Sequence, residues 1–255
     1  MATIDYEVRD RVVLVTLDRP DAHNTVNPAM AAGLEAAIDR YEANDELWAA
    51  VLTGRGSVFC AGADLAAVVA GLGPDLLTER GGFAGLCRRP RTKPLIAAVD
   101  GPALAGGCEM ALACDLVVAS ERAVFGLPDV KRSMIASGGA LFRLPRLVGT
   151  KVGLEMILTG EPIGAERAYQ VGMVNRIVAA GTATEVALAL AQRIAANAPL
   201  AVQESMAVAA AATEGDESEM WRATAEAASR VARSEDFAEG PRAFVEGRPP
   251  RWQGR

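Results

Sequence analysis

Residues 100–115 read DGPALAGGCEMALACD, and they follow directly on the apolar run KPLIAAV at residues 93–99. A second glycine-containing stretch, FCAGADL, occupies residues 59–65. In both stretches small residues would let backbone N–H groups approach a ligand, and the start of a following helix adds a partial positive charge. The two stretches therefore predict a site for an anionic group. The alternative is that Gly106 and Gly107 only let a helix pack closely on a strand.

Two carboxylates accompany these stretches. Glu109 lies between apolar neighbours, where an ionisable group is costly unless it is hydrogen-bonded or used. Asp129 follows in FGLPDVKRSM, residues 125–134. Paired carboxylates near an anion-stabilising backbone site are what proton transfer beside a carbonyl requires. For Asp129 the alternative is a surface ion pair with Lys131 or Arg132.

The rest of the chain predicts an α/β fold, because buried strands alternate with amphipathic helices. Asn27 and Pro28 form an N-cap signal before a helix that extends to Tyr41. The glycine-rich stretch 71–85 is expected to be a mobile loop with some helical turns. Strands are expected at 12–17, 49–53, 95–99, 116–119 and 174–178, and helices at 151–159, 165–171 and, with breaks near Pro199 and Gly215, 182–244.

Composition excludes several functional classes. The 255 residues carry 26 Lys and Arg against 32 Asp and Glu, a net charge of −6, which gives no basic surface for nucleic acid. One histidine and four cysteines without a CxxC pair argue against a metal site. No dinucleotide fingerprint or P-loop motif is present. Without an apolar span or a secretory signal, the expected location is the cytoplasm, with reduced cysteines.

The quoted stretches, together with the later FGLPDVKRSMIASGGALFRLPRLVG and the closing EGPRAFVEGR, strongly resemble the crotonase superfamily, the enoyl-CoA hydratases and isomerases. The resemblance covers almost the whole chain. It implies a spiral of ββα units in residues 1–195 that binds acyl-CoA, followed by a helical oligomerisation region in residues 196–255. It also implies a homotrimer or a dimer of trimers, a role in fatty acid metabolism, and no cofactor beyond the coenzyme A of the substrate.

The resemblance also assigns the site. The backbone N–H groups of Ala63 and Gly106 match the positions that bind the thioester oxygen, an oxyanion hole. Glu109 matches the first catalytic acid, and Asp129 matches the second, where hydratases usually carry glutamate. The positions that match substrate-binding residues are Ala22, Ala61, Asp64, Leu65 and Ala66.

The expected function is hydration of a trans-2-enoyl-CoA thioester, and three departures from the family pattern bear on it. Asp129 is one methylene shorter than glutamate, which changes how two acids can hold a water. Ser133 replaces a glycine, and Gly247 replaces a lysine that contacts CoA. The alternatives are an enoyl-CoA isomerase, a carnitinyl-CoA-like dehydratase, or a CoA-thioester-binding protein with little catalysis. Basic residues that could contact CoA phosphates, or form a solvated turn, are Arg88, Arg89, Arg91 and Lys93.

Overall fold

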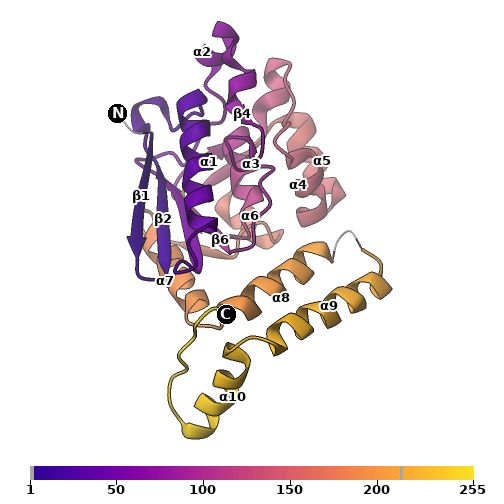
Figure 1. Ribbon diagram of the computed structural model, residues 1–255. Helices are drawn as coiled ribbons and strands as arrows, with labels where there is room; N and C mark the ends of the chain where they lie inside the picture. Colours follow the sequence, from indigo (N-terminus) through magenta and orange to yellow (C-terminus); the bar gives the residue numbers. More distant parts are fainter. Residues whose placement is uncertain (1–2, 213–214) are drawn as a thin grey trace.

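The computed structural model describes residues 3–212 and 215–255, which form a core and an arm (Figure 1). The core, residues 3–195, holds every β-strand of the described chain. The arm, residues 196–255, holds three helices in its described residues, and they project beyond one end of the core. The predicted division at residue 195 falls between helix α7 (Ala183–Ala195) and helix α8 (Pro199–Ala211).

The core is built on a six-stranded sheet with the strand order β1-β2-β3-β6-β8-β11. β1 is antiparallel to β2, whereas every other neighbouring pair is parallel. This arrangement confirms the predicted α/β class, because parallel strands require crossover connections that place helices on the sheet. The strands are β1 (Ile4–Arg9), β2 (Val12–Leu17), β3 (Ala49–Gly54), β6 (Leu95–Val99), β8 (Leu116–Ser120) and β11 (Arg176–Val178).

Shorter elements complete the core. A three-stranded sheet has the order β10-β9-β7, and β4 pairs with β5 as a hairpin. These strands are β4 (Leu77–Thr78), β5 (Gly82–Phe83), β7 (Pro102–Leu104), β9 (Val124–Gly126) and β10 (Ile163–Gly164). The helices are α1 (Pro28–Glu42), α2 (Leu65–Ala67), α3 (Gly106–Ala113), α4 (Ala140–Val148), α5 (Thr150–Thr159), α6 (Ala165–Gln170) and α7, with the short turns η1 (Pro20–Ala22), η2 (Val68–Leu72), η3 (Pro74–Leu76) and η4 (Pro128–Arg132).

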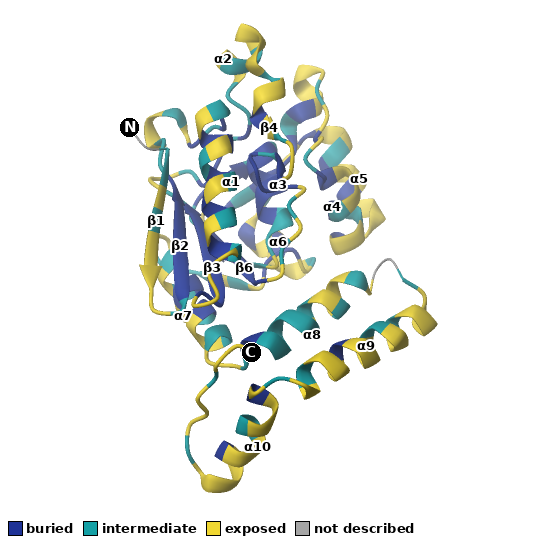
Figure 2. Ribbon diagram, in the orientation of Figure 1, coloured by how far each residue is buried: buried dark blue, intermediate teal, exposed yellow. Residues whose placement is uncertain are grey.

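Both faces of the main sheet are buried, as the continuous apolar strand VVLVTL predicts. On one face, Val12 and Leu14 of β2 pack in a cluster with Leu188 of α7. On the other face, Val13 and Val15 belong to a larger cluster that includes the apolar stripe of α1 and part of α3. Figure 2 shows the central strands as buried and the arm as mostly half-buried or exposed. The core thus anchors α3, which carries the candidate acid.

Local sequence signals place α1 as expected. The side chain of Asn27 accepts a hydrogen bond from the Met30 amide at 2.9 Å, and Pro28 stands at the first helical position. The sequence reading missed β1, a largely exposed edge strand. In 71–85, expected to be a mobile loop with some helical turns, the structure has the helical turn η3, but it also has the β4-β5 hairpin, which was not predicted. Glu35 of α1 accepts a 3.0 Å hydrogen bond from the Gly81 amide and so ties this hairpin to the core.

The predicted helical stretch from 182 to 244 consists of α7, α8, α9 (Glu217–Ala232) and α10 (Asp236–Glu246). Pro199 begins α8, and Asp216 caps α9 by accepting a hydrogen bond from the Glu219 amide. The end of the chain folds back on α10, because the buried carboxylate of Asp236 accepts hydrogen bonds from the amides of Gln253 and Gly254. The C-terminal segment is therefore held by hydrogen bonds within the arm.

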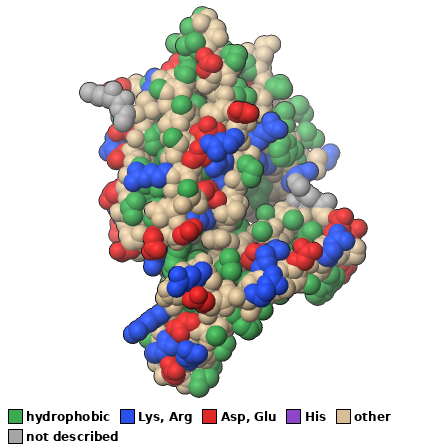
Figure 3. All heavy atoms as spheres, viewed as in Figure 1, with side chains coloured by type: hydrophobic (Ala, Val, Ile, Leu, Met, Phe, Trp, Pro, Cys, Tyr) green, Lys and Arg blue, Asp and Glu red, His purple; other side chains and the backbone are tan. Residues whose placement is uncertain are grey.

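The surface gives two further findings. Within residues 3–212 and 215–255, no helix is both long enough and apolar enough to cross a membrane. On the face drawn in Figure 3, acidic and basic side chains are interspersed over the core and the arm. This face therefore lacks the single-sign basic patch that a nucleic-acid surface would need.

Candidate active site

The two glycine-containing stretches lie against each other. Loop 60–64 pairs with loop 103–104 through the bridge between Cys60 and Ala103, and the Leu104 amide donates to the Cys60 carbonyl at 3.0 Å. A Cβ on Gly62 would lie 2.8 Å from the Cβ of Ala105, and one on Gly107 would lie 2.0 Å from the Cys60 carbonyl oxygen. Only glycine fits at such distances. Gly107 therefore does allow close packing, but its neighbour is the loop at Cys60 and not a strand, and this packing brings the two loops together.

An unusual backbone turn directs the start of α3. Ala105, the residue before α3, has φ 50° and ψ −124°, a conformation that costs a non-glycine residue about 1–3 kcal/mol. Gly106 is the first residue of α3, so its amide has no partner inside the helix. Across the described chain, neither the amide of Gly106 nor that of Ala63 donates to a protein acceptor. Two free N–H donors are thus available where the loops meet.

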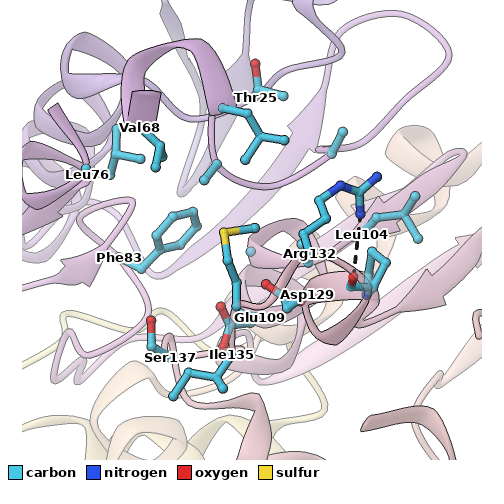
Figure 4. A pocket seen from close by; sticks show the side chains of 18 of the residues that line it. Thr25, Val68, Leu76, Phe83, Leu104, Glu109, Asp129, Arg132, Ile135 and Ser137 are labelled. Carbon is cyan, nitrogen blue, oxygen red and sulfur yellow. Dashed lines mark hydrogen bonds between the residues drawn. The ribbon is translucent and has the colours of Figure 1, made fainter. Parts of the chain in front are cut away.

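A cavity of about 510 Å³ opens in front of these donors. Six of the residues predicted for the site line it: Ala61, Ala63, Leu65, Gly106, Glu109 and Asp129. Most of the remaining lining is apolar and comes from the segment between α2 and β5 and from the residues after η4 (Figure 4). The cavity therefore combines backbone donors, two carboxylic acids and an apolar wall.

Glu109 is buried, with 3% of its surface exposed. Its Oε1 accepts a hydrogen bond from the Ala140 amide at 3.2 Å, and the nearby backbone of Gly138 also favours the charged form of the carboxyl. Burial raises the pKa of Glu109 to about 7, because desolvation and the nearby Asp129 outweigh the effects of Ala140, Gly138 and the charge of Arg143. A carboxyl with such a pKa can both accept and donate a proton near neutral pH.

Asp129 faces the same cavity from η4 and lies beside Glu109 (Figure 4). It is 9% exposed, and its Oδ2 is a buried oxygen without a hydrogen-bond partner in the described chain. Burial raises its pKa, whereas the charge of Arg132 opposes the rise. The alternative of a surface ion pair is wrong, because Lys131 pairs with Glu161 and Arg132 donates to the Pro128 carbonyl. A buried acceptor without a partner indicates a ligand or water.

Comparisons with known proteins agree with this geometry. The family model described as enoyl-CoA hydratase/isomerase matches residues 7–255. The chain belongs to this family. A carnitinyl-CoA dehydratase of Salmonella heidelberg (strain SL476) is 38% identical over 250 residues, which cover 96% of this chain and 95% of the relative.

Solved structures share the fold along the whole chain. The crystal structure of an enoyl-CoA hydratase from Mycobacterium tuberculosis H37Rv has a TM-score of 0.96 at 43% identity, with both chains covered completely. That of a carnitinyl-CoA hydratase from Mycobacterium avium has a TM-score of 0.79 at 45% identity, again with complete coverage. The predicted crotonase fold is therefore confirmed. The chain is a crotonase-superfamily protein.

Three other positions suggested by the crotonase resemblance lie outside the cavity wall. Asp64 accepts hydrogen bonds from the first amides of α2 and forms a 3.1 Å ion pair with Arg19, so its carboxylate already has structural partners. Ala66 is exposed on α2, and Ala22 ends η1. Their contact with the outer part of CoA stays a prediction. Ser133 and Gly247 are absent from the cavity lining.

The basic cluster of this crotonase was predicted either to contact CoA phosphates or to form a solvated turn. For three of its four residues, both predictions are wrong. Arg91 donates to both oxygens of Asp115, at 2.7 and 3.0 Å, and Lys93 is only 4% exposed. These side chains fix the loop before β6 and are neither solvated nor free for phosphate; Arg88 alone is exposed. The partners are Asp39 for Arg89, Asp115 for Arg91, and the carbonyls of Tyr41 and Asn44 for Lys93.

Sequence reasoning missed Phe83 of β5, an aromatic residue of the cavity wall. An ideal Cβ on Gly106 would lie 2.2 Å from its Cε1 and 2.4 Å from its Cζ, so the ring packs directly on the start of α3. The turn that carries the ring is tight, since Gly82, Ala84 and Gly85 all have positive φ. The only sequence signal was an aromatic residue among glycines, GGFAG, residues 81–85.

Proposed function

We propose that the protein hydrates trans-2-enoyl-CoA thioesters. The observation that carries the proposal is one cavity in which two buried carboxylic acids, Glu109 and Asp129, accompany two free backbone amides, those of Ala63 and Gly106. Free amides stabilise the negative charge that develops on a thioester oxygen, and acids move the protons of water. The names of relatives in the family support the same reaction class.

In the proposed reaction, Glu109 as carboxylate takes a proton from a water while the water oxygen bonds to Cβ of the substrate. The electron pair of the double bond moves toward Cα and the thioester oxygen, where the amides of Ala63 and Gly106 hold the enolate. Asp129 helps to orient the water and delivers a proton to Cα. Its unpartnered Oδ2 is a suitable acceptor for that water. The reverse sequence dehydrates a 3-hydroxyacyl thioester with the same groups.

We further propose an uncharged acyl group rather than a carnitinyl group. The wall opposite the acids is apolar and includes Val68, Leu76 and Phe83. Among the described residues that line the cavity, Glu109 and Asp129 are the only acids, while Arg132 adds a positive charge beside them. A trimethylammonium group would meet that charge and would find only one aromatic ring. Comparison of crotonyl-CoA with its trimethylammonium counterpart tests this; faster turnover of the charged thioester contradicts it.

We also propose a trimeric assembly and a reaction that needs no cofactor beyond the substrate's own coenzyme A. The arm supports the assembly, because large apolar side chains of α9 and α10 are exposed in the single chain. They are Trp221 at 68%, Phe237 at 54%, Phe244 at 88% and Val245 at 84% exposure. Contact with a second copy would bury this surface.

The test of the main proposal is hydration of crotonyl-CoA in H₂¹⁸O. A hydratase places one labelled oxygen at Cβ of the product, and Glu109→Gln should abolish that label while a CoA thioester still binds. A shifted double bond without incorporated oxygen would assign an isomerase instead. Binding without either change across a panel of thioesters would contradict an enzymatic function.

A further inference from the structure

We propose that Arg143 is a positioning residue for Glu109, which acts through the backbone of residues 138–140 without entering the substrate cavity. The inference rests on the proposed role of Glu109 as the base of the reaction. Arg143 lies on α4, whose first residue, Ala140, donates to the Glu109 carboxylate.

The loop before α4 cradles the carboxylate. The Ala140 amide donates to Oε1 of Glu109 at 3.2 Å, and Gly138 packs against the same carboxylate. A Cβ on Gly138 would lie 2.7 Å from Oε2, so the backbone itself is in contact with the acid. Any movement of residues 138–140 therefore changes the position of the carboxylate directly.

Arg143 holds that loop from the other side. Its Nη1 donates to the Gly138 carbonyl at 3.1 Å, and a Cβ on Gly139 would lie only 2.3 Å from the same nitrogen. Gly139 has φ +109°, so the turn requires glycine both for its backbone and for the guanidinium. Among the described residues, no carboxylate forms an ion pair with Arg143. The Gly138 carbonyl is thus the polar group that holds the guanidinium of Arg143.

The guanidinium also acts on Glu109 electrostatically. The groups that face the acid are Asp129 from η4, Cys108 from α3, Cys87 from the turn after β5, and Arg143 from α4. Burial raises the pKa of both thiols, so they stay neutral near pH 7. Arg143 is therefore the cation that opposes the effects of burial and of Asp129 on Glu109.

Arg143 lines a cavity other than the substrate cavity. It lines a second cavity of about 480 Å³, together with Cys114 and Phe142, and it does not line the substrate cavity. A substitution there removes no side chain from the wall around the thioester. An effect on turnover consequently has to pass through the 138–140 backbone or through the charge.

The experiment compares Arg143→Met, which has similar length and no charge, with Arg143→Lys, which keeps the charge but lacks the planar fork. A matched control is Arg167→Met, which removes an exposed arginine on α6. We expect Arg143→Met to lower kcat for crotonyl-CoA by about 10- to 100-fold with little change in KM, since small displacements of a catalytic group have such costs. Its pH midpoint should move upward. Arg143→Lys should keep the midpoint and recover part of kcat.

A ¹³C NMR titration of the Glu109 carboxyl in parent and variants makes the inference independent of activity. An upward shift in Arg143→Met but not in Arg143→Lys supports it, even if the parent does not hydrate crotonyl-CoA and the proposed function fails. A folded Arg143→Met protein with parental kcat, pH midpoint and NMR titration overturns it. Equal losses in both variants with an unmoved titration would indicate a structural role and also overturn it. If Arg143→Met does not fold, Arg143→Gln takes its place.

Discussion

Gly106→Ala places a methyl group where the edge of the Phe83 ring already lies. The new Cβ would be 2.2 Å from Cε1, whereas contacting carbons stay roughly 3.5–4.0 Å apart. Either the ring or the start of α3 must therefore move by about 1.3 Å. An oxyanion donor works within about 2.7–3.1 Å of the oxygen, and loss of one donor costs roughly 10²- to 10³-fold in kcat. We expect a loss in that range for hydration of crotonyl-CoA. The rate is measured from the decrease in absorbance of the conjugated thioester.

The double variant Gly106→Ala with Phe83→Ala identifies the cause. Removal of the ring leaves room for the new methyl group, so the double variant should recover at least about tenfold in kcat over Gly106→Ala alone. Such non-additivity is expected for residues in contact. Phe83→Ala by itself is the control for the lost apolar wall, and thermal melting of each protein checks the fold. A folded Gly106→Ala enzyme with parental kcat would refute both the donor assignment and the ring contact.

Other expectations follow from the same site. Glu109→Gln should lower kcat by about 10²- to 10⁴-fold with CoA-thioester affinity retained; equal loss of both would make it a structural acid. Because burial raises the pKa of Glu109 to about 7 and the carboxylate is the base, the parental rate should rise as pH increases through 7, and a flat profile would contradict this. Asp129→Asn should lose hydration and Asp129→Glu should keep or increase it; parental rates in both would place Asp129 outside the reaction. Light scattering at micromolar concentration should report a trimer or hexamer, and a monomer would exclude the proposed assembly.

Local signals in the sequence were sufficient for the regular core. The N-cap at Asn27 and the apolar run 12–17 each specify their element within a few residues, and the structure has both. β1 was not predicted because an edge strand with one exposed face lacks a continuous apolar pattern. The hairpin within 71–85 was not predicted because its hydrogen-bond partner, Glu35 of α1, is distant in the sequence. Sequence reading cannot supply such a partner.

The same distinction applies to the site. Glu109 could be singled out from its apolar neighbours, since burial of a carboxyl is visible in the pattern. For Asp129 the residues alone favoured a surface ion pair, because Lys131 and Arg132 follow it directly. In the structure, Lys131 instead pairs with Glu161, a residue 30 positions away, and Asp129 is buried. Phe83 and Arg143 act through contacts across the fold that no local pattern encodes.

The contact between loops 60–64 and 103–107 has a consequence for heat inactivation. The two candidate donors come from segments about forty residues apart, and each loop holds the other in place through Gly62 and Gly107. Loop 60–64 is also held by Val26, whose amide donates to the Gly62 carbonyl at 2.8 Å, but the position of the two donors relative to each other depends on the contact between the loops. Separation of the loops would therefore disable the pair of donors in a single event. Local opening of this kind requires less free energy than global unfolding. Catalysis should therefore fail on heating in one cooperative, reversible step while the sheet beneath is still intact.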